Sequence, residues 1–128
     1  MNKSLIIWGA ITAALAVMLG AFGAHALKSI LTTESLQSFQ TAVNYQLIHG
    51  ISTLVVGMMY ERAQEKLLLL AGRLFLAGIL CFSGSIYLLT FLKHQHISFP
   101  PLIALVTPVG GILMIFAWLC TAWTFLRK

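Results

Sequence analysis

The sequence predicts an all-α, polytopic membrane protein whose four transmembrane helices form an antiparallel bundle. Two observations predict this fold class. Only 9% of the 128 residues are charged and 59% are hydrophobic, whereas a soluble domain usually carries about 25% charged residues. The sequence also contains four apolar stretches, each near the roughly 20 residues that a membrane-spanning helix needs. We therefore expect lipid to contact most of the surface of this protein.

Each apolar stretch predicts one helix. We expect helices over residues 5–24, 34–60, 67–92 and 101–127. The second begins early, because the segment Thr32-Thr33-Glu34 combines an N-cap residue with an acid in the first turn. The fourth begins at Pro101, since proline is well tolerated at the first helical position. The sequence shows no repeat and no low-complexity segment, so residues 1–128 should form a single four-helix transmembrane domain.

Basic residues are distributed unequally between the two sides of the predicted protein. The side with the two termini and the second connection carries Lys3, Arg62, Lys66, Arg73, Arg127 and Lys128. The other side carries Lys28 and Lys93. Short loops rich in Lys and Arg face the cytoplasm. We therefore expect the N-terminus and the C-terminus to be cytoplasmic.

The first apolar stretch has two possible interpretations. It begins with Lys3, and Ala24-His25-Ala26 has the small-x-small form of a signal-peptide cleavage site. However, the apolar run of about 20 residues exceeds the 7–15 residues that are usual in a signal peptide. We therefore favour a retained transmembrane helix, which places His25 at the membrane interface.

Small residues recur at helical spacing and predict close contacts between helix backbones. In the fourth helix, Pro108 removes a backbone hydrogen bond, and the glycines after it permit a bend. The residues expected at packing faces or kinks are Gly9, Ala13, Ala16, Gly20, Gly23, Gly84, Pro108, Gly110 and Gly111.

Polar residues at membrane depth are costly and often mark function. Counting along the predicted helices places those of the second, third and fourth helices in the outer half of the membrane. We expect one polar cluster there, formed by Asn44, Tyr45, Gln46, His49, Ser83, Ser85 and Thr107. Such side chains also form hydrogen bonds that hold helices together, so the cluster is either a ligand site or interhelical packing.

Several chemistries lack support in the sequence. All three acids, Glu34, Glu61 and Glu65, lie in predicted loops or at helix ends, so no carboxylate inside the membrane could drive ion antiport. The sequence lacks the spacing of a metal site and the motifs of hydrolases and nucleotide-binding proteins. Its basic residues are spread out and do not form a nucleic-acid-binding stripe. We expect no enzymatic activity, no metal, no cofactor and no nucleic-acid partner.

Four motifs occur in an order that is typical of one protein family. They are GAFGAHAL at residues 20–27, NYQLIH at 44–49, FSGSIYLL at 82–89 and TPVGG at 107–111. The chain resembles domain-of-unknown-function family 423, and the resemblance extends over essentially its whole length. The resemblance implies a small four-helix protein of the bacterial plasma membrane, the inner membrane, and it implies no established activity.

Two classes of function remain open at this point. In the first, the protein is a structural or accessory membrane protein that binds lipid or another membrane protein. In the second, it is a small-solute carrier or channel, acting as a homo-oligomer around a polar site in the outer half. The expected partners are the lipid bilayer and a second copy of the chain, and no small-molecule ligand is identified.

Overall fold

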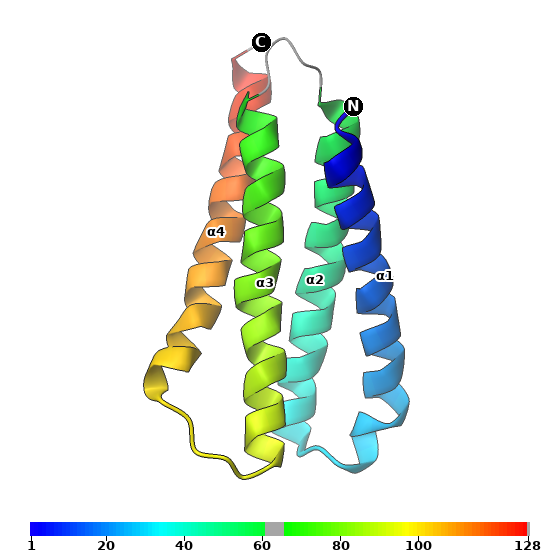
Figure 1. The fold of residues 1–128 in the computed structure, drawn as a ribbon, viewed down its shortest axis with the longest axis vertical. Helices are drawn as coiled ribbons and strands as arrows, with labels where there is room; N and C mark the ends of the chain where they lie inside the picture. Colours follow the sequence, from blue (N-terminus) through cyan, green and yellow to red (C-terminus); the bar gives the residue numbers. More distant parts are fainter. Residues whose placement is uncertain (61–65, 128) are drawn as a thin grey trace.

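The structure, a computed structural model, describes residues 1–60 and 66–127 and contains four long α-helices (Figure 1). They are α1 (Lys3–His25), α2 (Thr33–Met59), α3 (Lys66–His94) and α4 (Pro101–Leu126), and the short 3-10 helix η1 (Leu27–Ser29) follows α1. Both termini lie at the same end of the molecule (Figure 1). The predicted all-α class is confirmed.

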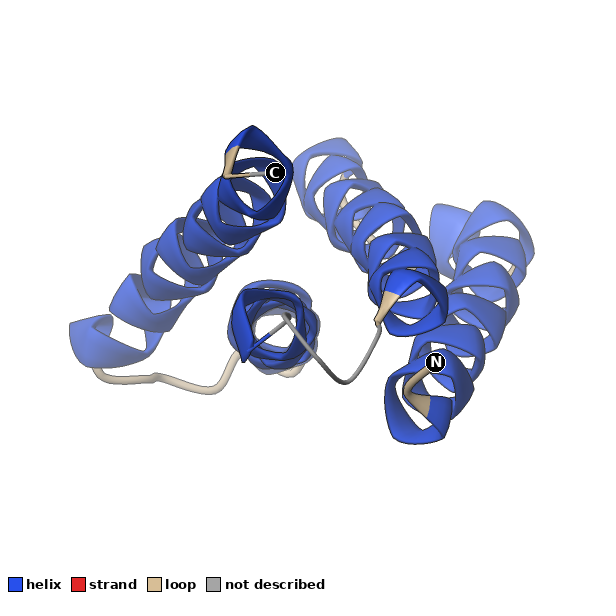
Figure 2. Ribbon diagram, turned by 90° about the horizontal axis from the view of Figure 1, so that it is seen from above, coloured by secondary structure: helices blue, strands red, loops and turns tan. Residues whose placement is uncertain are grey.

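The four helices form an open, curved row. Each packs against the next one along the chain, and α1 and α4 lie at the two ends of the row (Figure 2). We expected a bundle, and the antiparallel directions agree with that expectation, but the row does not close on itself. A soluble bundle must close to bury its apolar faces, whereas lipid covers apolar helix faces at no cost.

Three helices begin at residues that are typical of helix starts. The side chain of Thr32 caps α2 by accepting a hydrogen bond from the backbone N–H of Ser35 at 3.2 Å. Asn2 caps α1 in the same way, accepting from Leu5 at 3.1 Å. Pro101 is the first residue of α4.

The end of α3 is a Schellman motif. The backbone N–H of Ile97 donates to Leu92 at 3.0 Å, and that of His96 donates to Lys93 at 3.1 Å. The motif requires one left-handed residue, which here is His96 with φ of 55°. The motif therefore fixes the position of His96 just beyond the end of the helix.

The contact between α1 and α2 is a close approach of two backbones. A Cβ atom added to Gly9 would lie 2.5 Å from the backbone nitrogen of Leu54 and 2.7 Å from the carbonyl oxygen of Gly50. One added to Gly50 would lie 3.1 Å from the nitrogen of Ala13. A side chain at Gly9 would require the backbones to move apart, and one at Gly50 would be tight, so glycine at these positions permits the short distance between the helices.

Other small residues from the predicted set also lie at helix contacts. Ala16 is buried, and Gly20 and Gly23 face Val43 and Phe39 of α2. In α4, Gly110 packs directly on the backbone of Phe82.

Three residues of the predicted set differ in their surroundings. Gly84 has no atom within 4 Å of an added Cβ among the described residues, so it is not a packing glycine. The nearest atom to an added Cβ of Gly111 is 3.9 Å away, an ordinary contact. Pro108 is exposed, and α4 continues through it as one helix.

Helices α1, α3 and α4 are long and apolar enough to cross a membrane. Helix α2 has 27 residues, and its mean hydropathy is lowered by polar side chains along its length. Three of these, Gln46, His49 and Thr53, are buried against the neighbouring helices. The exposed large residues of α2 are mainly apolar, and they include Ile48, Ile51, Val55 and Met58.

The close approach of α1 and α2 leads to a stability prediction. We expect Gly9→Ala to lower the stability of the protein in detergent by about 1–3 kcal/mol, the usual cost of overpacking. The added methyl would meet backbone atoms that cannot move aside. Gly84→Ala is the matched control and should leave the melting temperature unchanged or slightly raised. Equal melting of the two variants would contradict the close packing of α1 on α2.

Candidate functional site

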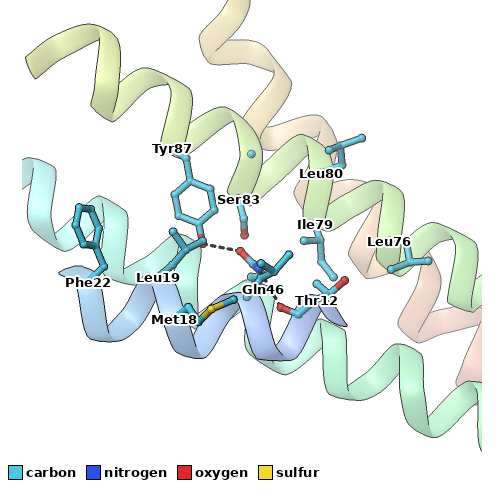
Figure 3. A pocket seen from close by; sticks show the side chains of 12 residues that line it. Thr12, Met18, Leu19, Phe22, Gln46, Leu76, Ile79, Leu80, Ser83 and Tyr87 are labelled. Carbon is cyan, nitrogen blue, oxygen red and sulfur yellow. Dashed lines mark hydrogen bonds between the residues drawn. The ribbon is translucent and has the colours of Figure 1, made fainter. Parts of the chain in front are cut away.

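Gln46 of α2 links three helices through its side-chain amide. Its Nε2 donates to the backbone carbonyl of Thr12 in α1 at 3.0 Å. Its Oε1 accepts from the hydroxyl of Tyr87 in α3 at 2.7 Å. Figure 3 shows this chain of hydrogen bonds. Nearby, Ser83 of α3 donates to the carbonyl of Ala42 at 2.7 Å. The group therefore connects α1, α2 and α3 at one depth.

His49 forms a second polar group, which connects α2 to α4. The indole N–H of Trp118 donates to its Nε2 at 3.2 Å, and its Nδ1 lies 2.7 Å from the carbonyl oxygen of Tyr45. An indole N–H is only a donor and a carbonyl only an acceptor. The imidazole is therefore the neutral tautomer with its proton on Nδ1. The ring of Phe75 packs against it, with the ring centres 5.6 Å apart.

Ser85 and Thr107 form the third group. Their hydroxyl oxygens are 2.6 Å apart and join α3 to α4. The hydroxyl of Ser85 also donates to the carbonyl of Phe82 at 2.9 Å. Its single proton is then used, so Thr107 donates within the pair.

The seven polar residues that we expected to form one cluster are thus divided. His49 packs beside Phe75, which lies ten residues before Ser85 on α3. At 1.5 Å per residue, the two positions are about 15 Å apart in depth. This distance excludes one hydrogen-bonded group that contains both His49 and Ser85.

Two residues of the expected cluster lie on the surface. Asn44 is exposed. Tyr45 is 41% exposed, and its ring stacks on that of Phe82 with centres 4.5 Å apart. Among the described residues, every buried polar side-chain atom has a hydrogen-bond partner. His25 is exposed at the end of α1.

Two of the partners were not expected from the sequence. Thr12 contributes a backbone carbonyl, which no side-chain pattern reveals. Trp118 is 45% exposed, and its indole N–H finds an acceptor on α2 all the same. Its spacing along α4 does not indicate that the acceptor is on α2.

A groove lies between α1 and α3, beside the Gln46 group (Figure 3). Its volume is about 580 Å³. It is lined by Thr12, Leu15, Met18, Leu19, Phe22, Gln46, Leu76, Ile79, Leu80, Ser83, Gly84 and Tyr87. Most of these side chains are apolar. The polar ones already bond to protein partners, so the groove presents an apolar surface.

Among the described residues, α1 has far fewer contacts with α3 than with α2, and this leaves room for the groove. Close to the N-terminus, Leu5 packs on Gly72, where an added Cβ would lie 2.5 Å from a methyl carbon of Leu5. Toward η1 the two helices separate, and the groove opens between them. The open space beside Gly84 is part of this groove. The best candidate site is thus an apolar groove with a closed end and an open end.

Comparison with known proteins identifies relatives along most of the chain. The family described as "Protein of unknown function (DUF423)" matches residues 19–111. A UPF0382 membrane protein of Staphylococcus aureus is 36% identical over 117 residues, which cover 91% of this chain and 90% of the relative. One of Bacillus subtilis is 37% identical over 118 residues and covers 91% of both chains.

A third relative, from Haemophilus influenzae, is also a UPF0382 membrane protein. It is 37% identical over 107 residues, which cover 84% of this chain and 81% of the relative. No solved structure matches the chain. The relatives share their description as membrane proteins, in agreement with the three apolar helices. The chain therefore belongs to the DUF423 family of membrane proteins, a family of unknown function.

Proposed function

We propose that the protein is a small accessory protein of the bacterial plasma membrane that binds one acyl chain of a membrane lipid in the groove between α1 and α3. The observation that carries this proposal is the length of the groove. From Leu76 to Tyr87 it follows eleven residues of α3, about 16 Å at 1.5 Å per residue. From Thr12 to Phe22 it follows ten residues of α1, about 15 Å.

This length equals one leaflet of a bilayer, whose hydrocarbon core is about 30 Å thick in total. A transmembrane helix of a partner protein would need a groove that extends along the whole core. The lining of this groove begins only at Thr12 and Leu76, part way along α1 and α3, and the contact of Leu5 with Gly72 closes the space between the helices near the termini. Its dimensions and its apolar lining therefore favour one lipid chain.

We further propose that α2 spans the membrane, so that the protein is multi-pass with four spans. Helix α2 has 27 residues, about 40 Å, which exceeds the hydrocarbon core. It lies between α1 and α3, both apolar enough to cross a membrane. Its polar side chains Gln46, His49 and Thr53 are buried against the neighbouring helices, and the exposed residues from Ile48 to Met59 are apolar, whereas Asn44 is exposed nearer the start of the helix. Burial of the polar side chains removes the main cost of placing α2 in lipid.

The proposed orientation places both termini in the cytoplasm. Lys3, Lys66 and Arg127 lie at the end of the molecule where the termini lie, and Arg73 lies two turns into α3. Lys28 and Lys93 lie at the opposite end. Arg62 and Lys128 of the predicted set are outside the described residues. The open end of the groove then faces the outer leaflet.

We also propose that the protein is not an enzyme. The carrier or channel alternative needs polar groups that contact water or solute. The polar side chains around Gln46, His49 and Ser85 instead bond to protein atoms. Helix α4 is continuous through Pro108, whereas the binding helices of many carriers are broken. Assembly into a homo-oligomer stays a prediction, and no observation favours a solute.

The topology is tested with reporter fusions. A reporter that is active only in the cytoplasm should work when it is fused after Arg127 and fail when it is inserted after Gln95. A reporter that is active only outside should give the reverse pattern. Cytoplasmic activity at Gln95 alone would contradict the orientation, and cytoplasmic activity at both sites would contradict the span of α4 between Gln95 and Arg127.

Acyl-chain binding is tested by filling the groove. Gly84→Leu places a side chain in open space, so the protein should fold while the groove loses volume. Purified protein in vesicles is irradiated with a phospholipid that carries a diazirine near the end of one acyl chain. We expect labelling at Leu76, Ile79 or Leu80, and at least an approximately tenfold loss in Gly84→Leu, since blocking a chain of many CH₂ groups at about 0.8 kcal/mol each removes most of the affinity.

Two controls separate groove filling from other effects. Gly84→Ala makes the same change in helix propensity with one methyl group, and it should keep most of the labelling. Ala77→Leu adds bulk on the exposed face of the same helix, and it should label as the unchanged protein does. Uniform labelling of all lipid-facing helices, unaltered in Gly84→Leu, would show that the groove holds no preferred chain.

A further inference from the structure

A second pocket lies beyond the open end of the groove, between the start of α2 and the end of α3. Its volume is about 470 Å³, and its lining includes polar and charged side chains beside Ile30 and Leu31. Glu34 and Ser35 come from the first turn of α2, while Lys93 and His94 come from the last turn of α3. His96, held by the Schellman motif, completes the basic side. One wall is therefore acidic and the other basic.

The pocket and the acyl-chain groove are neighbours that share lining residues with a third pocket. A smaller pocket of about 130 Å³ lies between them and shares Tyr87 with the groove. It shares Ile30, Leu31 and His94 with the charged pocket. Along α3, one helix face from Leu76 to His94 thus lines all three spaces, over about 27 Å. The lining changes from apolar in the groove to charged in the second pocket. A phospholipid has the same order, with an apolar acyl chain followed by a charged headgroup.

The pocket contains side chains of both charges. Glu34 and Lys93 line the same pocket, yet no ion pair joins them in residues 1–60 and 66–127. The carboxylate of Glu34 would repel a headgroup with only negative charge. The ammonium group of Lys93 would repel a purely cationic group. A headgroup that carries both charges satisfies both walls at once.

We propose that the charged pocket binds the headgroup of a phospholipid that contains a phosphate and a primary ammonium group, with the acyl chain of the same molecule in the groove. Lys93, with the ring N–H groups of His94 and His96, donates to the phosphate oxygens. Glu34 accepts hydrogen bonds from the N–H groups of the primary ammonium. A quaternary ammonium has no N–H groups and cannot form these bonds. This inference rests on the proposed acyl-chain site and adds to it the class of lipid.

The experiment uses the full chain in vesicles that contain trace amounts of three diazirine-labelled lipids, each with the same acyl chains. Their headgroups are phosphoethanolamine, phosphoglycerol and phosphocholine. We expect phosphatidylethanolamine to label the groove about two- to fivefold more than either of the others, the range that one exposed ion pair provides. Glu34→Gln should reduce this preference to none. It should leave the labelling by phosphatidylcholine unchanged, which also shows that the variant is folded.

A second pair of variants tests the basic wall. Lys93→Gln should reduce labelling by all three lipids, because each carries a phosphate. Lys28→Gln removes a charge from the same end of the molecule but from outside the pocket, and it should have no effect.

The outcomes distinguish the headgroup site from the acyl-chain site. Equal groove labelling by the three lipids would overturn the headgroup proposal and leave the acyl-chain site intact. Stronger labelling by phosphatidylglycerol, retained in Glu34→Gln, would also overturn it in favour of a simple anionic preference. Failure of every lipid to label the groove would overturn both proposals.

Discussion

The fold depends on one constraint, which is that the buried polar side chains of α2 must find hydrogen-bond partners on the neighbouring helices. An amide or imidazole without a partner is costly in hydrocarbon, and α2 carries Gln46 and His49 near its centre. Neighbouring helices provide the partners: Thr12 of α1 and Tyr87 of α3 bond Gln46, while Trp118 of α4 bonds His49. Helix α2 thus occupies the middle of the protein although it is the least apolar helix.

The same constraint accounts for the groove. The glycines of α2 draw α1 close along its backbone, as the contacts at Gly9 and Gly50 require. Helix α1 is therefore positioned mainly by α2, and it has few contacts with α3, one of which is Leu5 on Gly72. Along the groove, Gln46 of α2 links α1 to α3 by hydrogen bonds to Thr12 and Tyr87. The space between them is apolar and open along one side, which in a membrane gives lipid access to it.

The fold class and the helix limits could be predicted from the sequence for physical reasons. Membrane thickness sets the length of an apolar stretch, and residues such as Thr32 and Pro101 have strong positional preferences. The open row of helices was not predictable. In lipid, an apolar helix face can stay exposed at no cost, so a bundle need not close, and no sequence pattern distinguishes an open row from a closed bundle.

The polar residues were predicted individually, but their grouping was not. Counting along helices gives the depth of a residue and leaves its direction around the helix undetermined. Asn44 and Gln46 are two residues apart, about 200° around α2 at 3.6 residues per turn, and only Gln46 faces the interior. Gly84 is a second example. A glycine in a membrane helix predicts close packing, but no neighbouring atom lies near Gly84 in the structure.

The proposal that α1 and α3 hold a lipid chain between them can be tested with an experimental structure of the protein in lipid nanodiscs that contain phosphatidylethanolamine. We expect one elongated density beside Gly84, from the depth of Leu76 to that of Tyr87, with its headgroup between Glu34 and Lys93. A helix of a second copy in this groove, or α1 packed against α3 along its whole length, would contradict the proposal.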